Sequence, residues 1–274
     1  TNGHRLIDTA RGVLEVLESY DNTAEATESG SLTAFNSNGF TVGDSVHTNE
    51  VDDATVSWTF RKAPGFFDIV TYTGNGVAGR TVAHNLESVP GCIMVKCTSD
   101  GENWRVFHRS TGATKAASLN SSAQAYADTA YWNDTAPTST EFSVGTGDGV
   151  NGDTKTYVAY LFAHDDQIFG ADSDESIIQC GSFSTSSSPA SVNLGWEPQW
   201  LLVKNATTGA SWDNWWMVDN IRGVYTDLSN YRLRADTSAA EQEFGDAIDF
   251  RATGFDFADS ASETYIYMAF RSPM

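Results

Sequence analysis

The chain is 274 residues long and contains 40% hydrophobic and 12% aromatic residues, which is enough for packed cores and excludes a disordered chain. Sixteen basic against 36 acidic residues give a formal net charge of −20, which argues against binding a nucleic-acid backbone or an anionic membrane surface. No apolar run approaches the roughly 20 residues that membrane insertion needs, and no secretory signal peptide is apparent.

Residues 1–62 contain three strand-forming stretches. They read HRLIDTARGVLEVL, SLTAFNSNGFTV and, at residues 54–62, ATVSWTFRK. The last is rich in aromatic and β-branched residues, which predicts a buried strand that closes a β-module. Residues 63–66, which include a Pro-Gly pair, are predicted to be a linker.

Residues 67–163 are predicted to form a complete β-module. Asn75-Gly76 and Asp100-Gly101 are turn signals between strand-like stretches. A polar loop, TGDGVNGD, then leads into a second closing strand, TYVAYLF. Residues 164–175 are predicted to be an acidic linker, and residues 176–274 a third module with the same order of stretches.

The closing strand occurs three times at nearly constant offsets, which is the signature of tandem units. Three positions of the second copy match positions of the third that lie 108 residues on: Tyr157, Val158 and Phe162 match Tyr265, Ile266 and Phe270. Three positions of the first copy match the second at an offset of 102 residues: Val56, Trp58 and Phe60 match Val158, Tyr160 and Phe162.

These repeats predict an all-β fold of tandem, jelly-roll-like β-sandwich modules related by an internal repeat of about 100 residues. Residues 1–62 match only the second half of a module, since Asp8 and Arg11 correspond to Asp219 and Arg222. A half sandwich exposes an apolar face and unpaired strand edges. We therefore expect upstream sequence or a neighbouring subunit to complete this first module.

The order of motifs resembles a known family. HRLIDTARG, TAEAT, SLTAFNSNGFTVGD, VSWTFRKAPGFFDIVTYTGNG, RTVAHNLESVPGCIMVKC and NWRVFH follow one another as in repetitive, tail-fibre-like virion proteins of tailed phages of marine bacteria and cyanobacteria. The resemblance covers residues 4–109 closely and the third module more loosely. It implies a virion structural or host-contacting role in a symmetric oligomer, often a trimer, and carries over no catalytic residue.

A tryptophan-rich stretch in the third module is the first candidate binding site. Aromatic faces beside polar side chains suit a sugar, and the candidate residues are Trp212, Asp213, Asn214, Trp215 and Trp216. The alternative is that these Trp side chains fill the core, as Trp104, which we match to Trp212, would in the second module. Trp215 and Trp216 cannot both point inward from one strand, so one of them is expected at a surface or an interface.

A second candidate site is the loop TGDGVNGD, where Asp148, Asn151 and Asp153 resemble an oxygen-ligand calcium loop. The alternative is an ordinary Gly/Asn/Asp loop. The acidic run with Asp44, Glu50, Asp52 and Asp53 allows the same two interpretations. No other cofactor is expected.

Motifs for catalysis are absent from the sequence. The five histidines are scattered without an HExxH pattern, and no G-x-S-x-G elbow occurs. Cys92, Cys97 and Cys180 lack disulfide spacing and are expected to be free thiols of a chain that folds in a reducing cytoplasm. The sequence therefore predicts a protein that is not an enzyme.

Two functions follow from these features. The first is a non-enzymatic phage virion component (a fibre, spike or capsid-surface protein), made in the host cytoplasm and bound to other virion subunits. The second is a lectin-like, carbohydrate-binding role through the Trp-rich surface of the third module, with a host-surface glycan as partner. A polysaccharide depolymerase is a third, weaker alternative.

Overall fold

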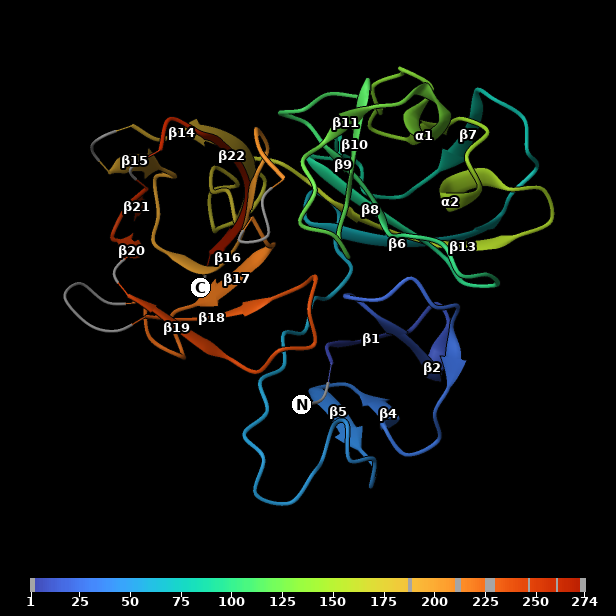
Figure 1. Cartoon of the computed structure of the whole chain (residues 1–274), viewed down its shortest axis with the longest axis horizontal. Helices are drawn as coiled ribbons and strands as arrows, with labels where there is room; N and C mark the ends of the chain where they lie inside the picture. The colour runs from blue at the N-terminus through green and yellow to red at the C-terminus, as the bar shows by residue number, and fades with distance from the viewer. Residues whose placement is uncertain are drawn as a thin grey trace.

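The computed structural model describes residues 3–186, 189–209, 213–224, 230–245, 247–259 and 261–271. These residues form an almost purely β fold in which every ladder between named strands is antiparallel (Figure 1). The two helices of the described residues have four residues each: α1 (Thr129–Trp132) and α2 (Asp148–Asn151). We describe the chain in three parts: the N-terminal part (residues 3–62), the middle part (63–163) and the C-terminal part (176–271).

The middle part consists of a six-stranded sheet and a two-stranded sheet. The large sheet has the order β11-β10-β9-β8-β13-β6, and the small sheet pairs β12 with β7. The bounds are β6 Phe67–Thr73, β7 Arg80–Ala83, β8 Cys92–Cys97, β9 Arg105–His108, β10 Lys115–Ser118, β11 Tyr126–Ala127, β12 Glu141–Val144 and β13 Thr156–Phe162. The predicted closing strand is β13, which pairs with β6 on one side and β8 on the other.

The C-terminal part has the same strand order in its six-stranded sheet, β14-β22-β16-β17-β18-β19, and a three-stranded sheet β15-β21-β20 beside it. The bounds are β14 Ile178–Ser184, β15 Ala190–Asn193, β16 Pro198–Asn205, β17 Trp216–Asp219, β18 Asn230–Arg234, β19 Gln242–Gly245, β20 Ile248–Arg251, β21 Gly254–Phe257 and β22 Thr264–Arg271. The registers correspond as well, since Tyr157 faces Cys97 in one part and Tyr265 faces Asn205 in the other.

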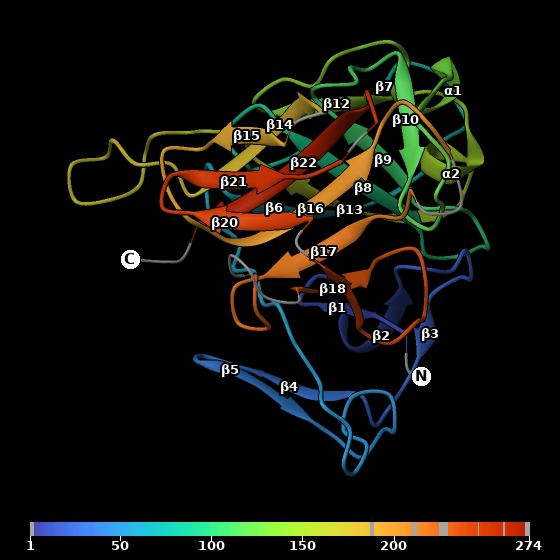
Figure 2. The same cartoon turned by 60° about the vertical axis from the view of Figure 1, so that its left-hand side comes forward.

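The N-terminal part has fewer strands. A three-stranded sheet, β1-β2-β3, lies near a separate hairpin, β4-β5. The bounds are β1 Arg5–Asp8, β2 Gly12–Glu18, β3 Ala26–Thr27, β4 Leu32–Asn36 and β5 Gly39–Val42. In Figure 2 the hairpin lies at the margin of the molecule, away from the two large sheets.

The predicted closing strand at residues 54–62 is not a strand, so this prediction is wrong. The segment belongs to no ladder among the described residues, and Val56, Trp58 and Phe60 are only half-buried while the residues between them are exposed. The physical reason is that a central strand needs a neighbour on each side, as β13 has in β6 and β8. The described residues of the N-terminal part provide neither neighbour.

The three parts pack around one another (Figure 1). Phe60, Phe162 and Phe270, one from each part, make mutual ring contacts at centroid distances of 6.0, 4.9 and 5.7 Å. One hydrophobic core runs through the middle part into the C-terminal part, where it includes Trp200 and Met268, and it also contains Leu17 of β2. The predicted acidic linker at residues 164–175 therefore connects two parts that share a core.

Candidate functional site

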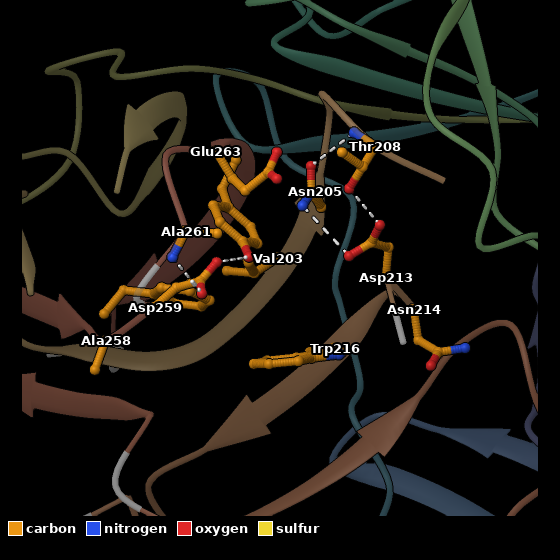
Figure 3. Close-up of a pocket in the computed structure, with 12 residues that line it drawn as sticks. Val203, Asn205, Thr208, Asp213, Asn214, Trp216, Ala258, Asp259, Ala261 and Glu263 are labelled. Carbon is orange, nitrogen blue, oxygen red and sulfur yellow. Dashed lines mark hydrogen bonds between the residues drawn. The ribbon is translucent and has the colours of Figure 1, made fainter. Parts of the chain in front are cut away.

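The C-terminal part carries a pocket of about 180 Å³ between the ends of β16, β17, β21 and β22 (Figure 3). Its described lining combines aromatic, amide and carboxyl groups from both sheets: Val203, Asn205, Thr208, Asp213, Asn214, Trp216, Phe257, Ala258, Asp259, Ala261, Glu263 and Tyr265. Three of the sequence-predicted binding residues, Asp213, Asn214 and Trp216, thus meet at one cavity.

Trp216 presents its ring to the pocket and is held by neighbours on its other sides. Its ring stacks on Phe257 at 5.8 Å and packs against Phe244 at 5.6 Å. The guanidinium of Arg232 lies 4.0 Å from the ring centroid, a cation–π contact. Burial lowers the pKa of Arg232 to about 10, and the neighbouring Arg234 adds to that effect. The ring is therefore fixed before any ligand arrives.

One wall of the pocket is built around the buried carboxylate of Asp213. Thr208 donates a hydrogen bond from its hydroxyl to Asp213 at 2.5 Å, and the Asn205 amide donates to the same carboxylate at 3.3 Å (Figure 3). The Asn205 side chain in turn accepts from the backbone N–H of Thr208 at 3.1 Å. Asp213 is thus a positioned acceptor in this wall.

The opposite wall comes from the loop between β21 and β22. Tyr265 donates its hydroxyl to Asp259 at 2.7 Å, and the backbone N–H of Ala261 donates to the same carboxylate at 3.1 Å. Burial and the adjacent Asp259 carboxylate raise the pKa of Tyr265, which therefore remains a donor. Glu263 lies on the same side (Figure 3). Both walls of the pocket therefore contain carboxylate groups.

Two polar atoms at this site have no hydrogen-bond partner among the described residues. They are the indole nitrogen of Trp216 and the amide oxygen of Asn214, and both are buried. The Asn214 amide nitrogen, by contrast, donates to Asp236 at 2.8 Å. An unpaired buried donor or acceptor costs free energy, and both atoms are closed off from solvent.

The other two tryptophan predictions have different outcomes. Trp215 is buried between the middle and C-terminal parts, where its indole nitrogen donates to the Ser118 carbonyl at 2.9 Å, so it does not line the pocket. Trp104 makes the corresponding bond to the Glu18 carbonyl, so its structural counterpart is Trp215. The predicted match of Trp104 to Trp212 is therefore wrong, and Trp212 lies outside the described residues.

At the corresponding position of the middle part, the chain's own side chains pack into the space. Arg105, which occupies the place of Trp216 in the register, packs over the Tyr131 ring at 4.2 Å. The helix α2 closes the space above, and a side-chain carbon added to Gly149 would lie 2.9 Å from the Arg105 guanidinium. The open pocket is thus a particular feature of the C-terminal part.

The predicted calcium loop folds as α2 and the turn after it. Asn151 is fully buried, and its amide donates to the Val77 and Gly145 carbonyls at 2.9 and 2.8 Å. Its oxygen accepts from the Asn75 N–H at 3.0 Å. Asp148 pairs with Lys155 at 3.2 Å, while Asp153 is exposed.

The geometry therefore does not gather Asp148, Asn151 and Asp153 around a common point. Lys155 also reaches Asp100 and Glu102, so an ammonium group occupies the centre of the local acidic cluster. Asp44, Glu50, Asp52 and Asp53 are all exposed. Across the part of the chain that the structure describes, no group of three His, Cys, Asp or Glu residues converges as a metal site.

The described histidines and cysteines serve structural contacts. Burial lowers the pKa of His108 to about 4, and its Nε2 donates to the Tyr267 carbonyl at 3.0 Å. Cys92, Cys97 and Cys180 are buried free thiols, as expected from their spacing, and burial raises the pKa of Cys92 to about 12. A thiol held in its neutral form is a poor nucleophile.

The wall formed by Asp259, Glu263 and Tyr265 was not predicted from the sequence. The available signal was the length of one loop. Six residues, 258–263, join β21 to β22, whereas eleven residues, 145–155, join β12 to β13. The longer loop carries α2, which covers the site in the middle part, and the shorter loop leaves it open.

The comparisons with known proteins identify a family without an assigned function. The chain belongs to the family described as "Domain of unknown function (DUF7483)", whose model matches residues 1–273. No curated protein matches the chain. The solved structure "Crystal Structure of the STIV MCP" is similar at 11% identity and a TM-score of 0.18, over 74% of this chain and 85% of that one, which is too distant to carry an argument. Neither helix is long or apolar enough to cross a membrane within the described residues.

Proposed function

We propose that this protein is a non-enzymatic structural component of a tailed-phage virion, built from two complete and one partial β-sandwich module. The observation that carries the proposal is a set of corresponding contacts that closes the three parts into a ring. Such a ring provides a rigid scaffold whose three parts present related surfaces.

Matching strands support the modular interpretation. The middle and C-terminal sheets share one strand order, and β1-β2-β3 corresponds to β17-β18-β19. The correspondence extends to side chains: Arg11 bonds Asp8, Glu25 and the Leu6 carbonyl, and Arg222 bonds Asp219, Glu241 and the Met217 carbonyl in the same way. One ion-pair network thus recurs in two parts.

The junctions between parts support ring closure. Trp104 of the middle part donates to the Glu18 carbonyl of the N-terminal part at 2.8 Å, and Trp215 of the C-terminal part donates to the Ser118 carbonyl of the middle part. At the corresponding position of the N-terminal part, His4 donates to the Arg234 carbonyl of the C-terminal part at 3.0 Å. Each part thus bonds the next, and the third bond returns to the first.

The contact of Phe60, Phe162 and Phe270 places equivalent residues of the three closing segments at one point. Equivalent residues of three related parts would meet in this way at a rotation axis, which supports our proposal that the chain is an internal pseudo-trimer. A scaffold of this symmetry matches a threefold-symmetric neighbour, such as the trimeric fibre that the sequence resemblance implies. We therefore propose other virion subunits as partners and the virion as the location.

Immunoelectron microscopy tests this function. Antibody raised against the chain is expected to label intact, purified particles at a fixed position, with pre-immune serum as the control. Quantitative mass spectrometry of the same particles is expected to find the chain at a constant copy number. Particles without the chain would overturn the proposal.

The pocket of the C-terminal part supports a second function, the binding of a host-surface glycan. Trp216 lines the pocket and offers apolar ring surface to the C–H groups of a sugar ring, and the carboxylates of Asp213 and Asp259 can accept hydrogen bonds from sugar hydroxyls. The absence of such a pocket at the corresponding place in the middle part favours a dedicated site.

A glycan array with matched variants tests this second function. Trp216→Ala is expected to lower the affinity for a bound glycan at least about tenfold, because the stacking face is lost. Phe35→Ala, which truncates an exposed ring on β4, is the control and should leave binding unchanged. Equal binding by the wild type and Trp216→Ala, or no binding to any glycan, would refute the lectin hypothesis.

A further inference from the structure

Three segments of the N-terminal part have at least one backbone edge without a strand partner in the described residues. β1 pairs with β2 on one side and with no described strand on the other. The extended segment 54–62 has no ladder on either side, and β5 pairs only with β4. Unpaired strand edges are sites where another strand adds.

The complete parts show which strands fill these positions. β1 corresponds to β9, which pairs with β8, and to β17, which pairs with β16. The segment 54–62 corresponds to β13, which lies between β6 and β8. β5 corresponds to β12 and β21, which pair with β7 and β15. The vacancies are therefore those of the first three strands of a module.

Apolar side chains are already in place around these vacancies. Phe40 on β5 is 37% exposed, whereas its counterparts Phe142 and Phe255 are each 1% exposed. Trp58 is half-buried, whereas its counterpart Tyr160 is 6% exposed. Burial of such surface is favourable, so the N-terminal part has surface that a suitable segment would cover.

A buried lysine gives the expected segment a chemical signature. Lys96 at the end of β8 donates to the Asn22 carbonyl of the N-terminal part, and Lys204 of β16 donates to the Ser122 carbonyl of the middle part. Asn22 lies four residues after Glu18, whose carbonyl accepts from the junction Trp, and Ser122 lies four residues after Ser118, whose carbonyl does the same. The third junction uses the Arg234 carbonyl, and the carbonyl four residues beyond it, at the position that corresponds to Asn22 and Ser122, is that of Ser238.

We propose that these vacancies hold a three-strand segment of the β6–β7–β8 type whose last strand carries the pattern apolar-apolar-Val-Lys just before its final residue. The segment is covalently continuous with β1, as β8 is with β9 through residues 98–104. Its last strand lies between β1 and residues 54–62, and its lysine donates to the Ser238 carbonyl. This proposal rests on the modular architecture proposed above and not on the virion location.

The internal repeat supplies a direct test. Because Trp104 corresponds to His4, a second copy of residues 63–103, the donor copy, is fused directly ahead of His4. Backbone hydrogen exchange of this fusion is then measured by mass spectrometry. Protection of residues 54–62 and 39–42 is expected to rise by about 100-fold or more, because their amides enter ladders. A control fusion carries Val95→Asp in the donor copy, which places a charge on the inward face and should abolish the gain.

A second variant tests the lysine signature. Lys96→Met in the donor copy should retain the added strands but lower the protection gain, because the Ser238 carbonyl loses its donor. Equal protection in the fusion with the unchanged donor copy and in the Val95→Asp fusion would overturn the proposal. A loss of protection in β13 and β22 of the fusion with the unchanged donor copy would also overturn it.

The oligomeric state of the unfused chain tests the alternative that a second copy of the chain covers these edges. A concentration-dependent dimer in light scattering, with residues 54–62 already protected, would show that a second copy covers the edges and would also overturn the proposal. Neither result affects the virion function, which depends on finding the chain in particles. The two proposals therefore fail independently.

Discussion

At the scale of single residues, the junctions between the three parts depend on buried polar side chains that bond main-chain carbonyls. His108 shows the electrostatic consequence. Its Nε2 faces the Tyr267 carbonyl, which only accepts, and its Nδ1 accepts from the Ser110 N–H at 3.2 Å. Both contacts are satisfied by the neutral ring with its proton on Nε2. A second proton would remove the bond from Ser110 and place a charge in the buried junction.

We predict that acid weakens the fold through His108. Its pKa is about 4 in the folded chain, below the usual value of 6.5, so the unfolded chain binds more protons between these values. The contribution of His108 to the free energy of unfolding is therefore complete above pH 6.5 and is lost as the pH falls toward 4, by about 1 to 3 kcal/mol.

Urea unfolding followed between pH 7 and 4 measures this loss. In His108→Gln, a neutral donor replaces the ring, so the pH dependence should be shallower than in the wild type. His47→Gln, at a half-exposed position, serves as the control. Identical pH profiles for the wild type and His108→Gln would contradict the assignment.

The predicted site residues show how far sequence reasoning reaches at this scale. The rule that side chains alternate across a strand correctly separated Trp215 from Trp216, and the structure places one in an interface and the other in a pocket. The rule could not say which was which, because that depends on which neighbouring part covers each face. Asp259 joins the site from a loop that carries no motif.

At the scale of elements, α2 occupies the position in the middle part that corresponds to the pocket of the C-terminal part. The polar loop that precedes β13 suggested calcium because its composition is that of an oxygen-ligand loop. Composition does not determine which way the side chains point, and Asn151 points inward to bond three backbone groups. The side-chain amide of Asn151 thus holds the loop in place.

We predict that this loop is stable without calcium. Asn151→Ala should lower the free energy of unfolding by about 2 to 4 kcal/mol, because buried backbone groups lose their partners. Asp153→Ala, at an exposed neighbouring position, should change it by less than about 0.5 kcal/mol. Chemical denaturation with and without added calcium checks both values, and a calcium-dependent rise in stability that Asp153→Ala removes would show a metal site instead.

At the scale of the whole molecule, local patterns predicted the strands better than the arrangement. The offsets of 102 and 108 residues identified corresponding segments without showing that they lie together. The contact of Phe60 with Phe162 and Phe270 depends on the way the parts pack, which no periodicity encodes. The same limit explains the wrong strand prediction at residues 54–62, since a strand depends on partners that the pattern does not contain.

The ring leads to a prediction about cooperativity. Phe60 is the contribution of the N-terminal part to the Phe contact, so Phe60→Ala should loosen that part from the other two. We expect a loss of about 2 kcal/mol in the free energy of unfolding, below the range of about 3 to 5 kcal/mol for a core Phe, because Phe60 is only half-buried.

Hydrogen exchange should locate this loss. In Phe60→Ala, protection should fall first in β1 and β2 and remain high in β13 and β22, because the core shared by the middle and C-terminal parts is retained. Phe35→Ala, on the outlying β4–β5 hairpin, removes an equal side chain outside the contact and should leave β1 and β2 protected. A uniform loss of protection across all three parts would instead mean that the ring unfolds as one cooperative unit, with the Phe contact as its common centre.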